Sequence, residues 1–389
     1  MPRAVEDQGA LRRAWTAVTS AFASHAVLSG LLGPWMPELK ERAGLDASGL
    51  GVALTGFAVG LLVGTRVAGP AVRRLGGRGV VRSGIVGLGT GFGLLPLAGG
   101  LTSLAAIFLG IGLVAGLVDV AMNGEAVAVE RRFGRRVMTA IHGTWSVALF
   151  VGAGVASLGI AAGIPISVHL PLSAAVIVAA SFPLLRWLPR DRHGSAGGES
   201  GAQGAHRERA AGIVLLLCVI AAGSFLTEGI AMEWSAVYLR EALGAPRGVG
   251  GLGVVAFSAG MAATRFVGDR LVGRFGQAAI VRVGAGTAAL ALATMLLLPS
   301  VVGSIGALAV VGLCLGPVVP LAFRSAGSID RPRGGTALPL VVTAGYVGSI
   351  VGPLVVGFLA DRFGLRGAFL VPLVAVAAAA IAAGATRDR

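Results

Sequence analysis

The sequence predicts an all-α integral membrane protein, with twelve transmembrane helices arranged as two pseudo-symmetric six-helix bundles. Its 389 residues are 55% hydrophobic and only 13% charged, whereas a soluble domain carries about 25% charged residues. Such an apolar chain cannot hide its hydrocarbon-like surface in one water-bounded core, so it belongs in a bilayer. The second observation is that the chain repeats itself about 200 residues later.

The repeat consists of matching residues in and beside the short polar breaks between long apolar runs. The matched pairs are Leu39 and Leu239, Glu41 and Glu241, Gly44 and Gly244, Gly60 and Gly260, Arg74 and Arg274, Gly76 and Gly276, Arg82 and Arg282, Gly84 and Gly284, Arg131 and Arg331, Gly134 and Gly334, and Gly152 and Gly352. Two mostly apolar copies of one unit are typical of a transporter whose binding site lies between the copies.

Twelve apolar segments of about 20 residues are each long enough to cross the hydrocarbon layer as a helix. We expect these spans at 14–34, 48–68, 80–99, 102–126, 137–160, 168–187, 213–238, 248–268, 278–298, 302–324, 337–358 and 366–385. The link between the sixth and seventh spans is rich in Gly, Ser, Ala and charged residues, which predicts a flexible cytoplasmic tether over 189–212. The predicted domains are therefore an N-terminal bundle over 1–188 and a C-terminal bundle over 213–389.

The distribution of arginine predicts the orientation of the chain. Arginines cluster after the second, fourth, eighth and tenth spans and in the central link, whereas the loops 99–102, 161–167 and 299–302 carry no charge. Excess arginine marks the cytoplasmic side, so both termini are expected inside a bacterial cytoplasmic membrane. The net charge of +14 is spread over these loops rather than gathered on one basic face, which argues against a nucleic-acid partner.

Several loop and helix motifs resemble those of the major facilitator superfamily. That family's signature after the second span reads roughly Gly-x-Leu-Ala-Asp-Arg-x-Gly-Arg. Here the segment 69–78 reads GPAVRRLGGR, with Arg73 at the acidic position, and its second copy, 268–276, reads GDRLVGRFG. The second copy keeps an acid but is one residue longer. Any inward gate latch that the motif supplies in the family is therefore expected to be weaker in the first half.

A narrower resemblance is to the MosC-like branch of bacterial permeases, and it rests on the segments 119–130, 142–146 and 228–239. The superfamily resemblance implies that the first, fourth, seventh and tenth spans line a central cavity. It also implies alternating access, in which the two bundles rock to expose one site to each side of the membrane in turn.

Ionisable residues inside the predicted spans are the first candidates for function, because an unpaired charge in a bilayer costs at least ~2.5 kcal/mol. Glu228 lies roughly 22 Å along the seventh span, at about 1.5 Å per residue. Desolvation there opposes the charged form of the carboxyl, so the group can bind and release a proton, as coupling to a proton gradient requires. The alternative is a structural carboxyl that is hydrogen-bonded to a neighbouring helix.

Other polar groups lie in three of the remaining spans. Asp119 and Asn123, four residues apart, share one helix face and form a second proton site, a substrate contact or a helix–helix hydrogen bond. His25, in the first span, is either a satisfied buried residue or part of a proton relay, since histidine titrates near physiological pH. His142, in the fifth span, is expected to steady the bundle by a hydrogen bond, with a relay role as the second interpretation.

Residues near the helix ends complete the candidate set. Trp234 and Tyr238 are either interfacial anchors or rings that stack on a substrate. Arg66 and Arg265 either extend to the membrane surface or form salt bridges, with Glu125, Glu130 or Asp269 as partners, that open and close during transport. The residues predicted to form a cytoplasmic gate are Arg66, Arg74, Glu130, Arg265, Asp269 and Arg274.

Prolines and glycines predict where helices bend, because proline cannot donate its backbone hydrogen bond. Gly316, Pro317 and Pro320 are expected to interrupt the tenth span. Gly348, Gly352, Pro353 and Gly357 in the eleventh span resemble the antiporter motif of drug exporters, which lies in the fifth span of that group. The fifth span here lacks proline.

No phosphate-binding loop, zinc spacing or nucleophile motif is present, so we predict no enzymatic activity, cofactor or metal. The sequence predicts a secondary transporter, working as a monomer, that moves a small organic solute together with protons, with export favoured over uptake. An uncoupled facilitator of a sugar-like solute is the first alternative. A transport-inactive membrane sensor or scaffold is the alternative from another class.

Overall fold

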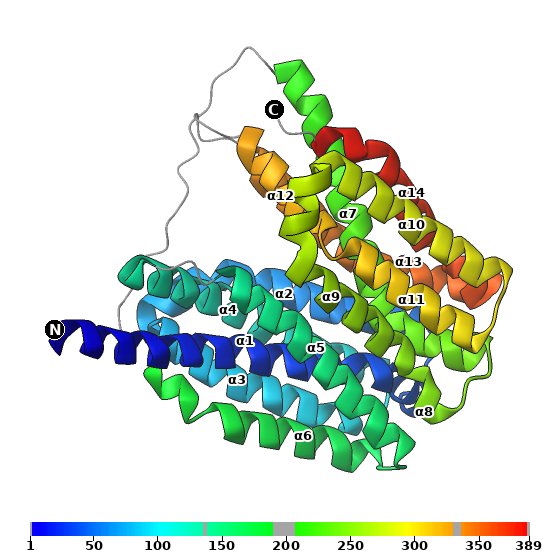
Figure 1. Ribbon diagram of the computed structural model, residues 1–389. Coiled ribbons are helices and arrows are strands. Elements are labelled where there is room, and N and C mark those ends of the chain that lie inside the picture. Colours follow the sequence, from blue (N-terminus) through cyan, green and yellow to red (C-terminus); the bar gives the residue numbers. More distant parts are fainter. Residues whose placement is uncertain (1, 135–137, 190–206, 330–335, 387–389) are drawn as a thin grey trace. The chain divides into compact units, whose positions relative to one another are not determined.

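The computed structural model describes residues 2–134, 138–189, 207–329 and 336–386, and these residues form an all-helical protein (Figure 1). The chain divides into two compact units. The first comprises residues 1–45 and 52–196, and the second comprises 46–51 and 197–389. Most of the predicted tether, from 190 to 206, lies outside the described residues. Residues 46–51, which include the start of the second helix, group with the second unit, although the sequence assigns them to the first bundle.

The first unit is built from six long helices and two short 3₁₀ turns. These are α1 (Pro2–Arg42), α2 (Ala47–Leu75), α3 (Gly77–Leu94), η1 (Leu95–Leu97), α4 (Leu101–Phe133), α5 (Met138–Ala161), α6 (Ile166–Ser181) and η2 (Leu184–Trp187). Helix α1 continues through Pro34 and Pro37, well beyond the predicted end of the first span at residue 34. Proline is tolerated inside membrane helices because neighbouring groups satisfy the backbone oxygens that it leaves free.

The second unit has the same order of long helices with more interruptions. Its elements are α7 (Arg207–Val237), the π-helical turn η3 (Tyr238–Ala242), α8 (Arg247–Gly250), α9 (Leu252–Phe275), α10 (Gln277–Leu297), α11 (Val301–Leu315), α12 (Val318–Ile329), α13 (Ala337–Ala368), α14 (Leu370–Ala382) and η4 (Ala383–Thr386). The predicted break in the tenth span is confirmed, because α11 ends at Leu315 and α12 begins at Val318, with Gly316 and Pro317 between them.

Ten helices among the described residues are long and apolar enough to cross a membrane. Of the two remaining expected passes, the eighth corresponds to α9, which carries Arg265 and Asp269 within its length. The twelfth corresponds to the shorter apolar segment Leu370–Thr386. The predicted all-helical membrane architecture is therefore confirmed.

Glycines bring two helices of the first unit into backbone contact. Helices α2 and α4 cross at Gly60 and Gly112. A Cβ atom added at Gly60 would collide with the carbonyl oxygen of Leu109, and one added at Gly112 would collide with that of Phe57. Small residues at helix crossings are typical of membrane proteins, because close backbone approach is a main source of helix association in lipid.

The second unit repeats this crossing between α9 and α11. A Cβ atom at Gly260 would collide with the carbonyl oxygen of Ala309, and one at Gly312 with that of Phe257. Each of these four residues stands 200 positions after its counterpart in the first unit. The internal repeat of the sequence is thus a repeat of helix packing, and the match between Gly60 and Gly260 has a steric cause.

Candidate functional site

Histidine 25 is held in α1 of the first unit by aromatic packing. Its ring meets Trp145 of α5 edge-on, with ring centroids 4.9 Å apart and an interplanar angle of 82°. The Phe22 ring also meets the Trp145 indole edge-on, with ring centroids 6.3 Å apart. The imidazole Nδ1 is buried and has no hydrogen-bond partner among the residues that the structure describes. Packing rather than a hydrogen bond at Nδ1 therefore positions this ring.

Asp119 and Asn123 lie together on α4, as their spacing predicts. The Asn123 side-chain amide donates to Oδ1 of Asp119 at 3.2 Å and to the Asp119 carbonyl oxygen at 2.9 Å. Both side chains are half-buried. The predicted shared face is confirmed, and the amide satisfies one oxygen of the carboxyl within a single helix.

Glu228 lies on α7 of the second unit, and the charge of Arg265 on α9 acts on its carboxyl. The sequence predicted Arg265 to pair with Glu125, Glu130 or Asp269, and the structure adds Glu228 as an electrostatic partner. Opposite charges attract far more strongly in a low-dielectric interior than in water. The two residues therefore form a pair of opposite charges on two helices of one unit.

Glu233 is a further intramembrane carboxyl, and it is not among the residues predicted from the sequence. It lies on α7 within the expected seventh span, and its Oε2 is buried without a hydrogen-bond partner in the described part of the chain. The rule that singled out Glu228, an ionisable residue inside a span, applies equally to Glu233. The signal was present in the sequence, and the structure adds that one carboxyl oxygen is unsatisfied.

The two aromatic candidates are packed inside the second unit. Trp234 and Tyr238 are both 0% exposed. The Tyr238 ring lies 4.6 Å from that of Phe369, measured between centroids, and the Trp234 indole nitrogen has no hydrogen-bond partner in the described ranges. In this conformation neither ring is open to a solute, so stacking on a substrate would require movement of the second unit.

The predicted gate residues occupy different environments. Arg66, Arg74 and Arg274 are exposed, and the Arg274 guanidinium lies over the ring of Phe275, 5.4 Å from its centroid. Glu130 is half-buried at the end of α4. The side chains of Asp269 and His142 lie outside what the structure describes, so their predicted roles stay predictions.

An acid lies beside the loop between α2 and α3, although Arg73 holds the acidic position of the motif. Glu125 of α4 is 5% exposed, and a Cβ atom added at Gly77 would collide with its Oε1. Gly77 is the first residue of α3, so the carboxylate lies at the amino end of that helix. Backbone N–H groups there carry partial positive charge, which stabilises an anion.

The paired helical units and the intramembrane polar groups define a helical membrane transporter. The chain belongs to the Major Facilitator Superfamily, whose model matches residues 18–326 and again 213–388. It is therefore a multi-pass secondary transporter and not an enzyme.

Its relatives are bacterial proteins of similar length. The chain is 29% identical to the uncharacterized transporter y4wD of Sinorhizobium fredii over 366 residues, which cover 92% of this chain and 94% of the relative. It is 28% identical to membrane protein MosC of Rhizobium meliloti over 381 residues, covering 96% and 90%. The predicted resemblance to the MosC-like branch is confirmed.

Solved structures of transporters share the fold. A variant of the nucleoside transporter NupG superimposes with a TM-score of 0.75 at 13% identity, covering 96% of this chain and 98% of that one. A D-xylose–proton symporter superimposes with a TM-score of 0.70 at 13% identity, covering 95% of each chain. Identities this low show the fold alone.

Proposed function

We propose that this protein couples the movement of a small organic solute across the bacterial cytoplasmic membrane to protons, by alternating access and with export favoured over uptake. The observation that carries the proposal is the charge pair of the second unit. Glu228 is half-buried on an apolar helix, and the charge of Arg265 on α9 acts on it. Intramembrane ionisable residues with a named partner mark ion and substrate pathways.

The pair gives proton binding a structural consequence. When Glu228 is ionised, the Arg265 guanidinium neutralises it and holds α9 to α7. When Glu228 takes up a proton, the guanidinium loses its countercharge and is free to attract another acceptor, such as an anionic group of the solute. Protonation thereby changes which groups attract one another, and this is the differential interaction that a shift between two conformations needs.

The other candidate residues have supporting roles in this proposal. Glu233 is a second proton site on α7, because one of its carboxyl oxygens has no partner among the described residues. Asp119, Asn123 and His25 contribute polar contacts to the solute from the first unit, with Trp234, Tyr238 and His142 as secondary candidates. The gate residues act at the cytoplasmic ends of the helices.

The orientation belongs to the same proposal. The arginine-rich loops after α2 and α4 support cytoplasmic termini, since positive residues are retained on the cytoplasmic side of bacterial membranes. In this orientation α7 runs outward, and Glu228 lies beyond the middle of the bilayer. We expect the protein to work as a monomer.

The test is transport by purified protein in lipid vesicles with an imposed pH gradient and a panel of candidate solutes. The Glu228→Gln variant keeps the size of the side chain and removes its ionisation. We expect loss of gradient-driven accumulation while exchange of solute across the membrane is retained. Glu241→Gln is the matched control, because Glu241 is an exposed residue in the π-helical turn η3 that directly follows α7.

Two results would contradict the proposal. Unchanged accumulation by Glu228→Gln would exclude this carboxyl as the coupling group. Equal solute flux with and without the gradient in the native protein would instead indicate an uncoupled facilitator. A parallel Glu233→Gln variant separates the two carboxyls, because loss of coupling in that variant alone would assign the role to Glu233.

A further inference from the structure

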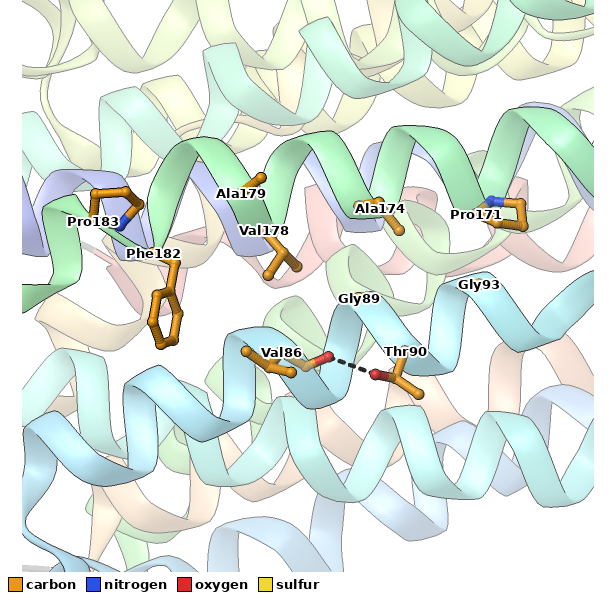
Figure 2. Close-up of a pocket in the computed structure, with 11 residues that line it drawn as sticks. Val86, Gly89, Thr90, Gly93, Pro171, Ala174, Val178, Ala179, Phe182 and Pro183 are labelled. Carbon is orange, nitrogen blue, oxygen red and sulfur yellow. Dashed lines mark hydrogen bonds between the residues drawn. The ribbon is translucent and has the colours of Figure 1, made fainter.

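The first unit contains a groove between two of its helices, α3 and α6. Helices α3 and α6 run next to each other and leave a space of about 600 Å³ between them (Figures 1 and 2). This volume is within the ~300–1,000 Å³ range of small-molecule sites. The main lining residues are Val86, Gly89 and Gly93 from α3, Ala174 and Val178 from α6, and Phe182 directly after the end of α6.

The walls of this groove suit an alkyl chain and offer little to a hydrophilic molecule. Thr90 is the one lining residue, among those described, with a polar side chain, and its hydroxyl donates to the Val86 carbonyl oxygen at 3.0 Å (Figure 2). The two helices approach closely at Gly89, where an added Cβ atom would meet the Val178 side chain. The small glycine and alanine residues thus leave space between the helices, and aliphatic side chains line the groove.

One end of the groove carries a positive charge. The Phe182 ring projects from just beyond the C-terminal end of α6 toward α3 (Figure 2), and the guanidinium carbon of Arg82 lies 4.4 Å from its centroid. Arg82 is about one and a half turns into α3, counted at ~3.6 residues per turn. Its Nε is buried without a hydrogen-bond partner among the described residues. The Nε–H group so placed lacks an acceptor, and the acceptors that fit an arginine fork best are a carboxylate and a phosphate.

We propose that this groove binds an anionic phospholipid, with an acyl chain between α3 and α6 and the lipid phosphate at Arg82. A membrane lipid fits better than a soluble phosphate compound, because both helices are membrane spans and their apolar side chains remain exposed beside the groove. Val86 of α3 is 40% exposed, and Val176 of α6 is 57% exposed. Basic pockets between transmembrane helices are known to bind anionic lipid head groups. The inference requires that α3 and α6 cross the bilayer, and it does not depend on the proposed proton coupling.

The test measures lipid binding to the delipidated full-length protein in detergent by native mass spectrometry. The probes are dioleoyl phosphatidylglycerol, dioleoyl phosphatidylcholine and, in a separate arm, inorganic phosphate. We expect phosphatidylglycerol to bind about fivefold more tightly than phosphatidylcholine, from one arginine near the membrane surface. Inorganic phosphate alone should neither bind nor displace the lipid.

Variants separate the two parts of the site. Arg82→Gln should abolish the preference for phosphatidylglycerol and leave phosphatidylcholine binding in place, whereas Arg82→Lys should keep part of the preference. Arg282→Gln is the matched control, because Arg282 is the counterpart of Arg82 in the repeat and is exposed on α10. Ala179→Leu, which adds volume in the groove, should weaken binding of both lipids.

The proposal is wrong if Arg82→Gln retains the preference, or if Arg282→Gln removes it equally. Unchanged lipid binding by Ala179→Leu would place the acyl chain outside this groove and would also overturn the proposal. Displacement of the lipid by inorganic phosphate would show a site for free anions instead. Each variant is first checked for monodisperse elution on size-exclusion chromatography, so that loss of binding is not confused with loss of folding.

Discussion

The start of α3 in the first unit and the start of α10 in the second make equivalent helix contacts. The long side chain comes from the neighbouring helix in the first unit and from α10 itself in the second. In the first unit, α3 begins with Gly77, and the long side chain of Glu125 comes from α4. In the second unit, α10 begins with Gln277, and its Oε1 accepts a hydrogen bond of 3.5 Å from the hydroxyl of Ser325 on α12. Gln277 and Ser325 stand 200 positions after Gly77 and Glu125. Both units therefore have a position for one long side chain at this contact. The helix that supplies the side chain differs between the units, and so does its charge.

The polar groups deeper in the spans differ in the same way. Oδ1 of Asp119 in the first unit accepts a hydrogen bond from Asn123 on its own helix. Glu228 of the second unit interacts with Arg265 on another helix. The repeat therefore preserves backbone packing and not electrostatics. The Glu228 carboxyl has a cationic partner on another helix of its unit, so protonation there can alter how these helices hold together.

The largest expected effect comes from breaking the backbone packing that both units share. Gly112→Ala and Gly312→Ala place a methyl group against a backbone oxygen that cannot move aside. Overpacking costs about 1–3 kcal/mol, and we expect values at or above the top of this range. Thermal unfolding of the detergent-solubilised protein should show a similar loss of stability for both variants.

Each of these variants has a control on the same helix. Gly110 of α4 and Gly306 of α11 have open space where a Cβ would stand, so alanine there should be neutral or stabilise by up to about 1 kcal/mol. A loss confined to one unit would show that the glycine matches are not equivalent in packing. Equal losses in the controls would refute the steric argument.

A smaller effect tests the exchanged contact at the start of α3 and α10. Gly77→Gln alone should destabilise the protein by about 1–3 kcal/mol, because the new side chain competes with Glu125 for one space. The double variant Gly77→Gln with Glu125→Ser recreates the pair of the second unit and should recover most of the loss. Thermal unfolding of the single and double variants measures this coupling. A double variant no more stable than Gly77→Gln would mean that the two contacts are not interchangeable.

The smallest expected effect concerns the pair within α4. Asn123→Ala removes both hydrogen bonds from the amide to Asp119, and hydrogen bonds in membrane interiors contribute about 0.6 kcal/mol each on average. The unfolding temperature should therefore fall only slightly. A loss comparable to that of Gly112→Ala would show that Asn123 also holds a second helix, and the contrast between the two units would then be smaller than described.

Local patterns were sufficient for some features of the site and insufficient for others. The shared face of Asp119 and Asn123 follows from helix periodicity, and the break between α11 and α12 follows from Gly316 and Pro317. Glu233 was within reach of the same reasoning. Arg265 as the partner of Glu228 was not, because the two residues are far apart in sequence and each has nearer oppositely charged residues along the chain.

The sequence by itself determined the membrane setting, the helical fold and the twofold repeat. Hydropathy, helix length and glycine spacing are properties of each segment's own residues and do not depend on how the segments pack. Only the tertiary structure decided which polar groups meet, that α1 passes through two prolines, and that α3 and α6 leave a groove beside Arg82. The reason is physical: a helix fixes which side its residues face, but the partner that a charge finds in lipid depends on how separate helices pack.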